Sequence, residues 1–119
     1  MWMFGVPHNN NPGTLGFDIR SNPGEVTTDS YVVDNQWHNV ILTRDGQTIK
    51  MFLDGNKIFE NSYDLTSLTT GNDYYIGTDN AELLQTWDGY LDDIILLGKT
   101  VSDEDVMDLY NDNLISFES

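Results

Sequence analysis

The residue types that carry most enzymatic and metal chemistry are sparse in this chain. Cysteine is absent, and the only histidines are His8 and His38. Thiol chemistry is therefore excluded, and two distant histidines predict neither a zinc site nor a nucleophilic triad. His8 has no evident companion. His38 is predicted to face a hydrophobic core beside Leu53, in a packed and hydrogen-bonded structural role.

Carboxylates and amides are the abundant polar groups, and they are the ligands that calcium prefers. One candidate set flanks the end of a predicted strand, and a second lies in the loop before the central hairpin. Neither set forms a dense ligand motif such as an EF-hand loop, so solvated loop acids are the alternative to a bound calcium ion. No other cofactor is required. The candidate ligands are Asp73, Asp79 and Asn80 in the first set, and Asp29 and Asp34 in the second.

Aromatic side chains beside polar loop residues predict a different kind of site, one for sugars. A pyranose ring stacks its C–H face on a flat aromatic group and hydrogen-bonds through its rim. Trp87 is one candidate platform and Trp37 is a second. The alternative is that these aromatic side chains belong to the core or to an interface. The polar and aromatic neighbours expected around Trp87 are Asp88, Asn80 and Tyr63.

A β-hairpin over residues 36–55 must position several of these groups. Asp45-Gly46 is predicted to be its two-residue loop, in a type I′ turn that favours Asp followed by Gly. Side chains alternate along a strand, so one face of the hairpin is apolar and should be core. The opposite face, which includes Trp37, is mixed and should be half-solvated or covered by a partner. The predicted core-face pairs are Leu42 with Ile49, Val40 with Met51, and His38 with Leu53.

Shorter patterns predict the remaining elements of a mostly β fold with one short C-terminal helix. Ser102 is the predicted N-cap of that helix, because acids fill its first turn and Val106, Leu109 and Tyr110 form an apolar stripe. The longest strand pattern runs from Trp87 to Leu97, and its end is apolar on both sides, as in a strand inside a sandwich. The other predicted strands cover the alternating Leu15, Phe17 and Ile19, then residues 25–28 and 31–33, 57–60 and 74–78.

Length and charge restrict the classes of partner. The chain has 119 residues, which predicts a single domain, and a net charge of −15. Nucleic-acid binding is not expected, because it needs clustered Lys and Arg. Nor is membrane insertion expected, since no apolar run approaches the roughly 20 residues that cross a bilayer, and residues 1–6 lack the features of a signal peptide.

Several motifs in series resemble the laminin G-like, concanavalin A-like jelly-roll modules. The first is Trp37-His38-x-Val40, followed by Asp45-Gly46 and then by residues 51–55, Met-Phe-Leu-Asp-Gly. Tyr75-Ile76-Gly77 resembles a later strand of that family. The closing strand and helix are matched by Gly89-Tyr90-Leu91-Asp92-Asp93-Ile94 and by Ser102-x-x-Asp105-Val106-x-x-Leu109-Tyr110. The resemblance covers about residues 36–111 and implies a two-sheet antiparallel jelly-roll sandwich.

The resemblance also implies that the chain is short at its N-terminal side. Modules of this type place several strands before the Trp-His hairpin, whereas about 35 residues precede it here. We therefore expect an opening strand or two to be missing, which would leave a sheet edge or a strip of core uncovered. A neighbouring copy, a partner chain, or residues 1–6 folded back as a strand are the candidates to cover it.

Three functions are compatible with this resemblance. The first is a non-catalytic binding or adhesion module that recognises a glycan or a protein surface. The second is a structural or decoration component of a virus or phage particle or fibre, forming homo-oligomers or docking on neighbouring structural proteins. A polysaccharide hydrolase is the remote third, because the Glu-x-Asp-x-Glu type pattern of the enzymatic relatives is absent; Asp88, Asp92 and Asp93 coincide with a fold signature instead. The module is thus expected not to be an enzyme and to act outside a cell or on a virion surface.

Overall fold

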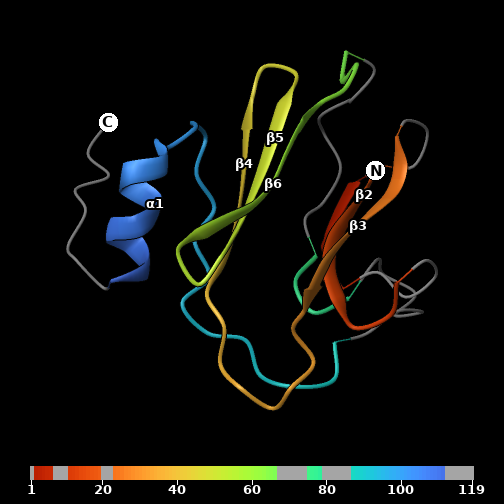
Figure 1. The fold of residues 1–119 in the computed structure, drawn as a ribbon, viewed down its shortest axis with the longest axis vertical. Helices are drawn as coiled ribbons and strands as arrows, with labels where there is room; N and C mark the ends of the chain where they lie inside the picture. The colour runs from red at the N-terminus through yellow and green to blue at the C-terminus, as the bar shows by residue number, and fades with distance from the viewer. Residues whose placement is uncertain (1, 7–10, 20–22, 67–74, 79–86, 112–119) are drawn as a thin grey trace.

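Two three-stranded antiparallel sheets and one short helix make up the described part of the chain (Figure 1). A computed structural model describes residues 2–6, 11–19, 23–66, 75–78 and 87–111. The mostly β fold with a C-terminal helix is therefore confirmed. The first sheet has the order β1-β2-β3 and the second β4-β5-β6. Their bounds are β1 Trp2–Gly5, β2 Thr14–Ile19, β3 Gly24–Tyr31, β4 Val40–Asp45, β5 Thr48–Leu53 and β6 Asn56–Ser62, with α1 at Asp103–Tyr110.

The core lies between the two sheets, as expected for a sandwich. Alternate residues of β2, namely Leu15, Phe17 and Ile19, are buried and share a cluster with Ile49 and Met51 of β5. Phe17 is fully buried, with its ring edge-on to Phe59 at 5.7 Å and to Tyr63 at 6.0 Å between centroids. The alternation in the sequence therefore marks the core-facing side of β2 correctly.

The outer edge of the first sheet is formed by the N-terminal residues. Residues Trp2–Gly5 form β1, which pairs with β2 from Trp2 opposite Ile19 to Gly5 opposite Gly16. The folded-back N-terminal segment, one of the three expected ways to cover this edge, is thus the arrangement in the structure. β3 extends to Tyr31, but its pairing with β2 shifts register between Thr27 and Tyr31, so the expected interruption near Asp29 occurs as an irregularity within the strand.

The register of the central hairpin differs from the predicted one by two residues. Asp45 pairs with Thr48, so the loop is Gly46-Gln47, and only Gly46 has a positive φ, 59°. Glycine at the first central position with a normal second residue is typical of a type II′ turn. Because side chains alternate with a period of two, this shift leaves each face unchanged. The pairs on this face are Val40 with Leu53, Leu42 with Met51, and Arg44 with Ile49, but Val40 is exposed and so is not the core residue that was expected.

The Asp-Gly turn chemistry that was predicted at residue 45 occurs at the next hairpin. Asp54 and Gly55 join β5 to β6, and both have positive φ, 50° and 84°. Two positive φ angles are the mark of a type I′ loop. A side chain at Gly55 would also meet the Tyr110 ring, with 2.7 Å from its Cβ to Cδ1. The turn therefore packs so closely against α1 that only a glycine fits at residue 55.

The other face of the second sheet is covered in part by the chain itself. Phe52 lies on that face and is buried, and Lys50, two residues earlier, bonds Asp103 of α1 with 3.1 Å between Nζ and Oδ1. The hydroxyl of Thr100, in the segment before α1, donates to the carbonyl of Arg44. A partner is thus not needed to bury Phe52. α1 begins as predicted, because the Ser102 side chain accepts from the Asp105 N–H.

The strand predicted over residues 87–97 is wrong. This segment contains no strand, and its side chains from Trp87 to Leu96 are exposed. In the described chain its backbone has one contact with another segment, from Trp87 N to Gly77 O at 2.7 Å. Asp93 has a positive φ of 51°, which interrupts an extended strand. An apolar pattern becomes a strand only where a neighbouring strand pairs with it, and no strand among the described residues pairs with this one.

Two further observations complete the fold. Of the predicted strand at 74–78, residue 74 lies outside the described residues, and Thr78 alone forms a bridge. Within the described ranges, no helix is long and apolar enough to cross a membrane.

Candidate functional site

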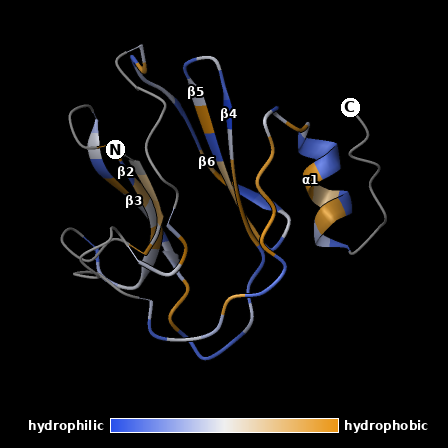
Figure 2. Ribbon diagram, turned by 180° about the vertical axis from the view of Figure 1, so that it is seen from behind, coloured by the Kyte–Doolittle hydropathy of each residue, from blue (hydrophilic) through white to orange (hydrophobic). Residues whose placement is uncertain are grey.

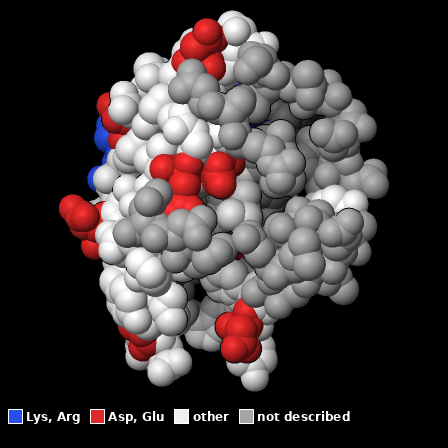
Figure 3. Space-filling model, turned by 90° about the vertical axis from the view of Figure 1, so that its right-hand side faces the viewer, with Lys and Arg blue, Asp and Glu red and all other residues white. Residues whose placement is uncertain are grey.

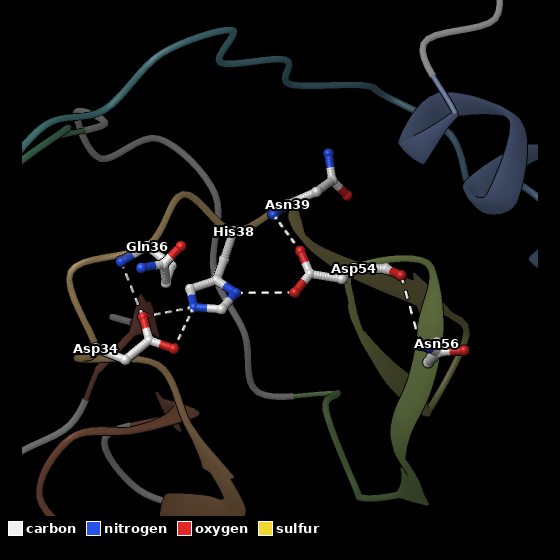
Figure 4. Close-up of polar contacts among 6 residues, drawn as sticks. All are labelled: Asp34, Gln36, His38, Asn39, Asp54 and Asn56. Carbon is white, nitrogen blue, oxygen red and sulfur yellow. Dashed lines mark hydrogen bonds and ion pairs between the residues drawn. The ribbon is translucent and has the colours of Figure 1, made fainter.

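His38 lies between two carboxylates that come from different segments (Figure 4). Its Nδ1 is 2.8 Å from Asp54 Oδ2, and its Nε2 is 2.9 Å and 3.0 Å from the two carboxylate oxygens of Asp34. Asp34 lies in the loop between the two sheets, and Asp54 in the type I′ turn after β5. We call this arrangement of Asp34, His38 and Asp54 the His38 clamp. It joins the loop between the sheets to the second sheet.

The clamp favours a charged imidazole. Each ring nitrogen faces a carboxylate acceptor, so both bonds form together only when both nitrogens carry a proton. The hydrogen bond with Asp54, and then that with Asp34, raises the pKa of His38 above its usual 6.5, against the opposing effect of burial. The hydrogen bond with His38 lowers the pKa of Asp34. The clamp is therefore an ion pair on both sides of the ring whenever the imidazole is protonated.

Backbone bonds extend the clamp along the loop. Asp54 Oδ1 accepts from Asn39 N at 2.9 Å, and Asp34 Oδ1 accepts from Gln36 N at 3.0 Å. Each carboxylate thus binds a backbone N–H as well as the imidazole. Residues on both sides of Trp37 are held in this way, which fixes the backbone that carries the indole.

Trp37 forms an exposed aromatic pair with Tyr90. The ring centroids are 6.5 Å apart with an angle of 43° between planes, and the two residues are 69% and 85% exposed. Tyr90 belongs to the segment 87–101, which runs past the loop between the sheets before it reaches α1 (Figure 1). Two adjacent rings with so little cover form an exposed aromatic surface beside the clamp, and we call them the aromatic platform.

Comparison with known protein families supports the resemblance seen in the sequence. Residues 1–107 match the family described as the concanavalin A-like lectin/glucanases superfamily. The chain belongs to this superfamily. Comparison with curated proteins finds no match.

A solved structure extends the likeness of this concanavalin A-like chain. An S-layer domain-containing protein from Clostridium thermocellum ATCC 27405, solved over its residues 221–444, is similar with a TM-score of 0.55 and 25% sequence identity. The alignment covers 83% of this chain and 52% of the solved one. The concanavalin A-like chain thus spans about half the length of that structure.

The predicted sugar-binding residues are dispersed in this concanavalin A-like fold. Trp37 is in the aromatic platform. Trp87 and Asp88 are exposed and lie close before Tyr90 in the sequence. Tyr63, by contrast, packs against the core beside Phe17. Asn80 lies outside the described residues. The structure therefore brings Trp37 to the segment that follows Trp87, but puts Tyr63 in the core.

The predicted calcium ligands do not form a cluster in the described chain. Asp34 directs its carboxylate to His38, and Asp29 is exposed on β3. Asp73, Asp79 and Asn80 lie outside the described residues. Among the residues that the structure describes, no three His, Cys, Asp or Glu side chains gather in a way that could hold a metal ion. Calcium binding stays a prediction.

Sequence reasoning missed two residues of the site. Tyr90 was assigned to a buried strand, so its exposed ring was not considered. Asp54 was placed on the mixed outer face of the hairpin, and its bond to a histidine 16 residues earlier was not foreseen. The sequence signal for the contact between His38 and Asp54 was that Trp37-His38 and Asp54-Gly55 stand at the two ends of one hairpin. These motifs must lie close together whichever two-residue loop joins the strands.

Proposed function

We propose that this concanavalin A-like domain is a non-catalytic carbohydrate-binding module that uses the aromatic platform. The observation that carries the proposal is the pair of rings Trp37 and Tyr90, both largely exposed and only 6.5 Å apart. Exposed aromatic surface is costly in water and gives favourable contact area to the C–H face of a sugar. The fold supports the proposal, since lectins are among the members of the superfamily.

The clamp supports affinity by holding the platform in place. Binding is weakened when a loop must be ordered as the ligand arrives, and a rigid loop avoids that loss. Asp34 and Asp54 hold the backbone on both sides of Trp37 through His38 and through two N–H bonds. The indole is thus presented before any sugar binds.

Charge favours a neutral sugar as the ligand. The chain has a net charge of −15, and Asp34 and Asp88 lie close to the platform residues in the sequence. Uronic acids and sulfated sugars would be repelled by such a surface. A neutral polysaccharide, stacked on the rings and hydrogen-bonded by exposed polar groups such as the Gln36 side chain, fits the site best.

The carboxylates of the clamp support a role without catalysis. A glycosidase needs one carboxyl group free to protonate the leaving oxygen and a second free to act as nucleophile or base. Asp34 and Asp54 are both bound to His38, which lowers the pKa of Asp34. A carboxyl group with a lowered pKa is a poor general acid at neutral pH.

Substitution of the platform tests this proposal. Trp37→Ala should weaken binding to a neutral polysaccharide at least about tenfold, because it removes roughly 1.4 kcal/mol or more of stacking. Tyr90→Ala should act in the same direction. Trp87→Ala is the matched control, since Trp87 is exposed but is not one of the two platform rings. Affinity electrophoresis through gels containing soluble glucans, mannans and xylans measures the change.

Two results would contradict the carbohydrate proposal. One is that none of these polysaccharides retards the unmodified protein, with calcium or with chelator. The other is that Trp37→Ala binds as tightly as the unmodified chain. In either case a protein surface would replace the sugar as the expected ligand, and the platform would lose its assigned role.

We also propose that calcium binds among the acidic and amide side chains Asp29, Asp73, Asp79 and Asn80. Carboxylate and amide oxygens suit calcium, and an ion that binds only the folded state raises the melting temperature. Adding calcium after chelation should therefore raise the melting temperature, and Asp79→Asn should reduce that shift while Asp64→Asn should not. An unchanged melting temperature would show that these carboxylates are only solvated.

A location at a surface outside the cell is proposed together with this function. The similar solved structure is of an S-layer domain-containing protein. The alternative of an assembly component of a virus or phage particle or fibre depends on a different surface, the exposed apolar segment before α1.

A further inference from the structure

The segment before α1 carries an apolar surface that neither sheet covers. Ile94, Ile95 and Leu96 are 54%, 56% and 68% exposed, and Leu91 is also exposed. Figure 2 shows hydrophobic colouring along this stretch, outside the two sheets. We call these four side chains the 91–96 patch. Single exposed apolar residues are ordinary, but a run of three in sequence is typical of an interaction site.

The backbone of the same segment pairs with no other strand of the described part of the chain. In the described chain, no residue from 88 to 101 takes part in a backbone-to-backbone hydrogen bond. Among the described residues, Asp93 N donates to the Asp92 side chain, the Thr100 hydroxyl donates to the Arg44 carbonyl, and the Tyr90 ring contacts Trp37. N–H and C=O groups that lack a neighbouring strand can add one from another chain.

Acidic side chains accompany the patch on both sides. From residue 87 to 105 the sequence contains six acids, Asp88, Asp92, Asp93, Asp103, Glu104 and Asp105, and one base, Lys99. Asp103 is neutralised by Lys50 and Lys57, while Asp92 and Asp93 are exposed within the patch segment. A different face of the molecule also shows acids with few bases (Figure 3). A partner with positive charge is therefore favoured.

We propose that the 91–96 patch docks an extended basic segment of a partner protein, which pairs by strand addition with residues 94–97, after the positive φ of Asp93. Because side chains alternate along paired strands, the partner's apolar side chains cover Ile95 on one side, and its Lys or Arg side chains lie on the other side and reach Asp92. A second copy of this chain is disfavoured as the occupant, because each copy brings a net charge of −15 and the same acids to the contact. The patch shares no residue with the aromatic platform, although Leu91 directly follows Tyr90 in the sequence.

A pair of synthetic peptides tests the proposal on the unmodified chain. The probe is an eight-residue peptide that alternates valine with lysine, and its control has glutamate in place of each lysine. The lysine peptide should bind, with affinity that falls as salt rises, and should protect the amides of residues 94–97 from hydrogen exchange. The glutamate peptide should bind at least about tenfold more weakly. Equal binding of the two peptides, or no protection of residues 94–97, would overturn the proposal.

Substitutions then locate the contact. Ile95→Ser should weaken binding of the lysine peptide at least tenfold, while Ile76→Ser should leave it unchanged, since Ile76 is the same residue type with 64% exposure in another segment. Asp92→Asn should reduce the salt dependence, and Asp29→Asn should not. Equal losses from Ile95→Ser and Ile76→Ser would contradict the proposed location.

Two controls separate this interaction from its alternatives. Trp37→Ala should bind the lysine peptide normally, which distinguishes failure of the sugar proposal from failure of this one. Light scattering after size exclusion should report a monomer. A dimer that Ile95→Ser dissociates would show that a second copy occupies the patch, and would overturn the assignment to a basic partner.

Discussion

His38 is held between two carboxylates, and this makes its charge part of the folded state. The ring is 18% exposed, with a carboxylate oxygen within 3.0 Å of each nitrogen. A neutral ring would have only one N–H to donate and would leave one acceptor without a donor. The raised pKa of His38 follows from this geometry.

The pH dependence of stability should reveal this charge. A pKa that is raised in the folded state contributes stability in full below the unfolded value, here 6.5, and that contribution is lost as pH rises through the folded pKa. The unfolding free energy of the unmodified chain should thus exceed that of His38→Gln by about 1–2 kcal/mol at pH 6, and the difference should shrink toward pH 9. Urea denaturation at a series of pH values measures it.

NMR titration of the imidazole checks the same arrangement directly. The pKa of His38 should lie above 6.5, and Asp34→Asn should lower it, because that carboxylate raises it. Asp29→Asn is the control, since Asp29 is an exposed acid on β3. A pKa at or below 6.5 in the unmodified chain, or a stability difference that grows with pH, would contradict the assigned role of the clamp.

At the scale of elements, the β4–β5 loop does more than reverse the chain. Gln47 accepts from Tyr63 N through its carbonyl at 2.9 Å, and from Leu65 N through its side-chain Oε1 at 2.7 Å. Leu65 is buried in the core cluster. The II′ turn therefore anchors the segment that leaves β6.

Removing the Gln47 acceptor should destabilise the fold through Leu65. Gln47→Ala leaves a backbone N–H of a buried residue without its partner, at a cost of about 1–3 kcal/mol in unfolding free energy. Gln47→Glu keeps an acceptor oxygen, so its unfolding free energy should fall by less. Denaturant unfolding of the two variants measures the difference. Equal destabilisation would show that the amide acts by packing and not as an acceptor.

At the scale of the whole molecule, the two sheets depend on one another through Phe17. Its ring comes from β2 and packs edge-on against Phe59 of β6 and Tyr63, so it joins the first sheet to the second. Neither sheet has another layer of comparable size among the described elements. The sandwich should therefore unfold as one unit.

Truncation of this ring should be among the most damaging single changes. Phe17→Ala should cost about 3–5 kcal/mol, because it removes buried apolar surface and leaves a cavity. Phe17→Leu should lose clearly less unfolding free energy. This variant can still be measured if the alanine variant does not fold. Val33→Ala, at an exposed position, is the control and should change stability by no more than about 0.5 kcal/mol. A small effect of Phe17→Ala would contradict the central place of this residue.

The sequence alone predicted those features that follow from local patterns. Alternation placed Leu15, Phe17, Ile49 and Met51 on the core side, and this survived a two-residue error in register because faces repeat every two residues. The Ser102 cap and the acids after it predicted α1 for similarly local reasons.

The tertiary structure decided which segments pair with or contact one another. The loop at Gly46-Gln47, the exposure of residues 87–96 and the bonds between His38 and its two carboxylates depend on segments far apart in the chain. A strand pattern specifies which way side chains alternate, but pairing requires a neighbour with free N–H and C=O groups. That neighbour is chosen by the packing of the whole molecule, and for this reason the aromatic platform and the 91–96 patch emerged only from the structure.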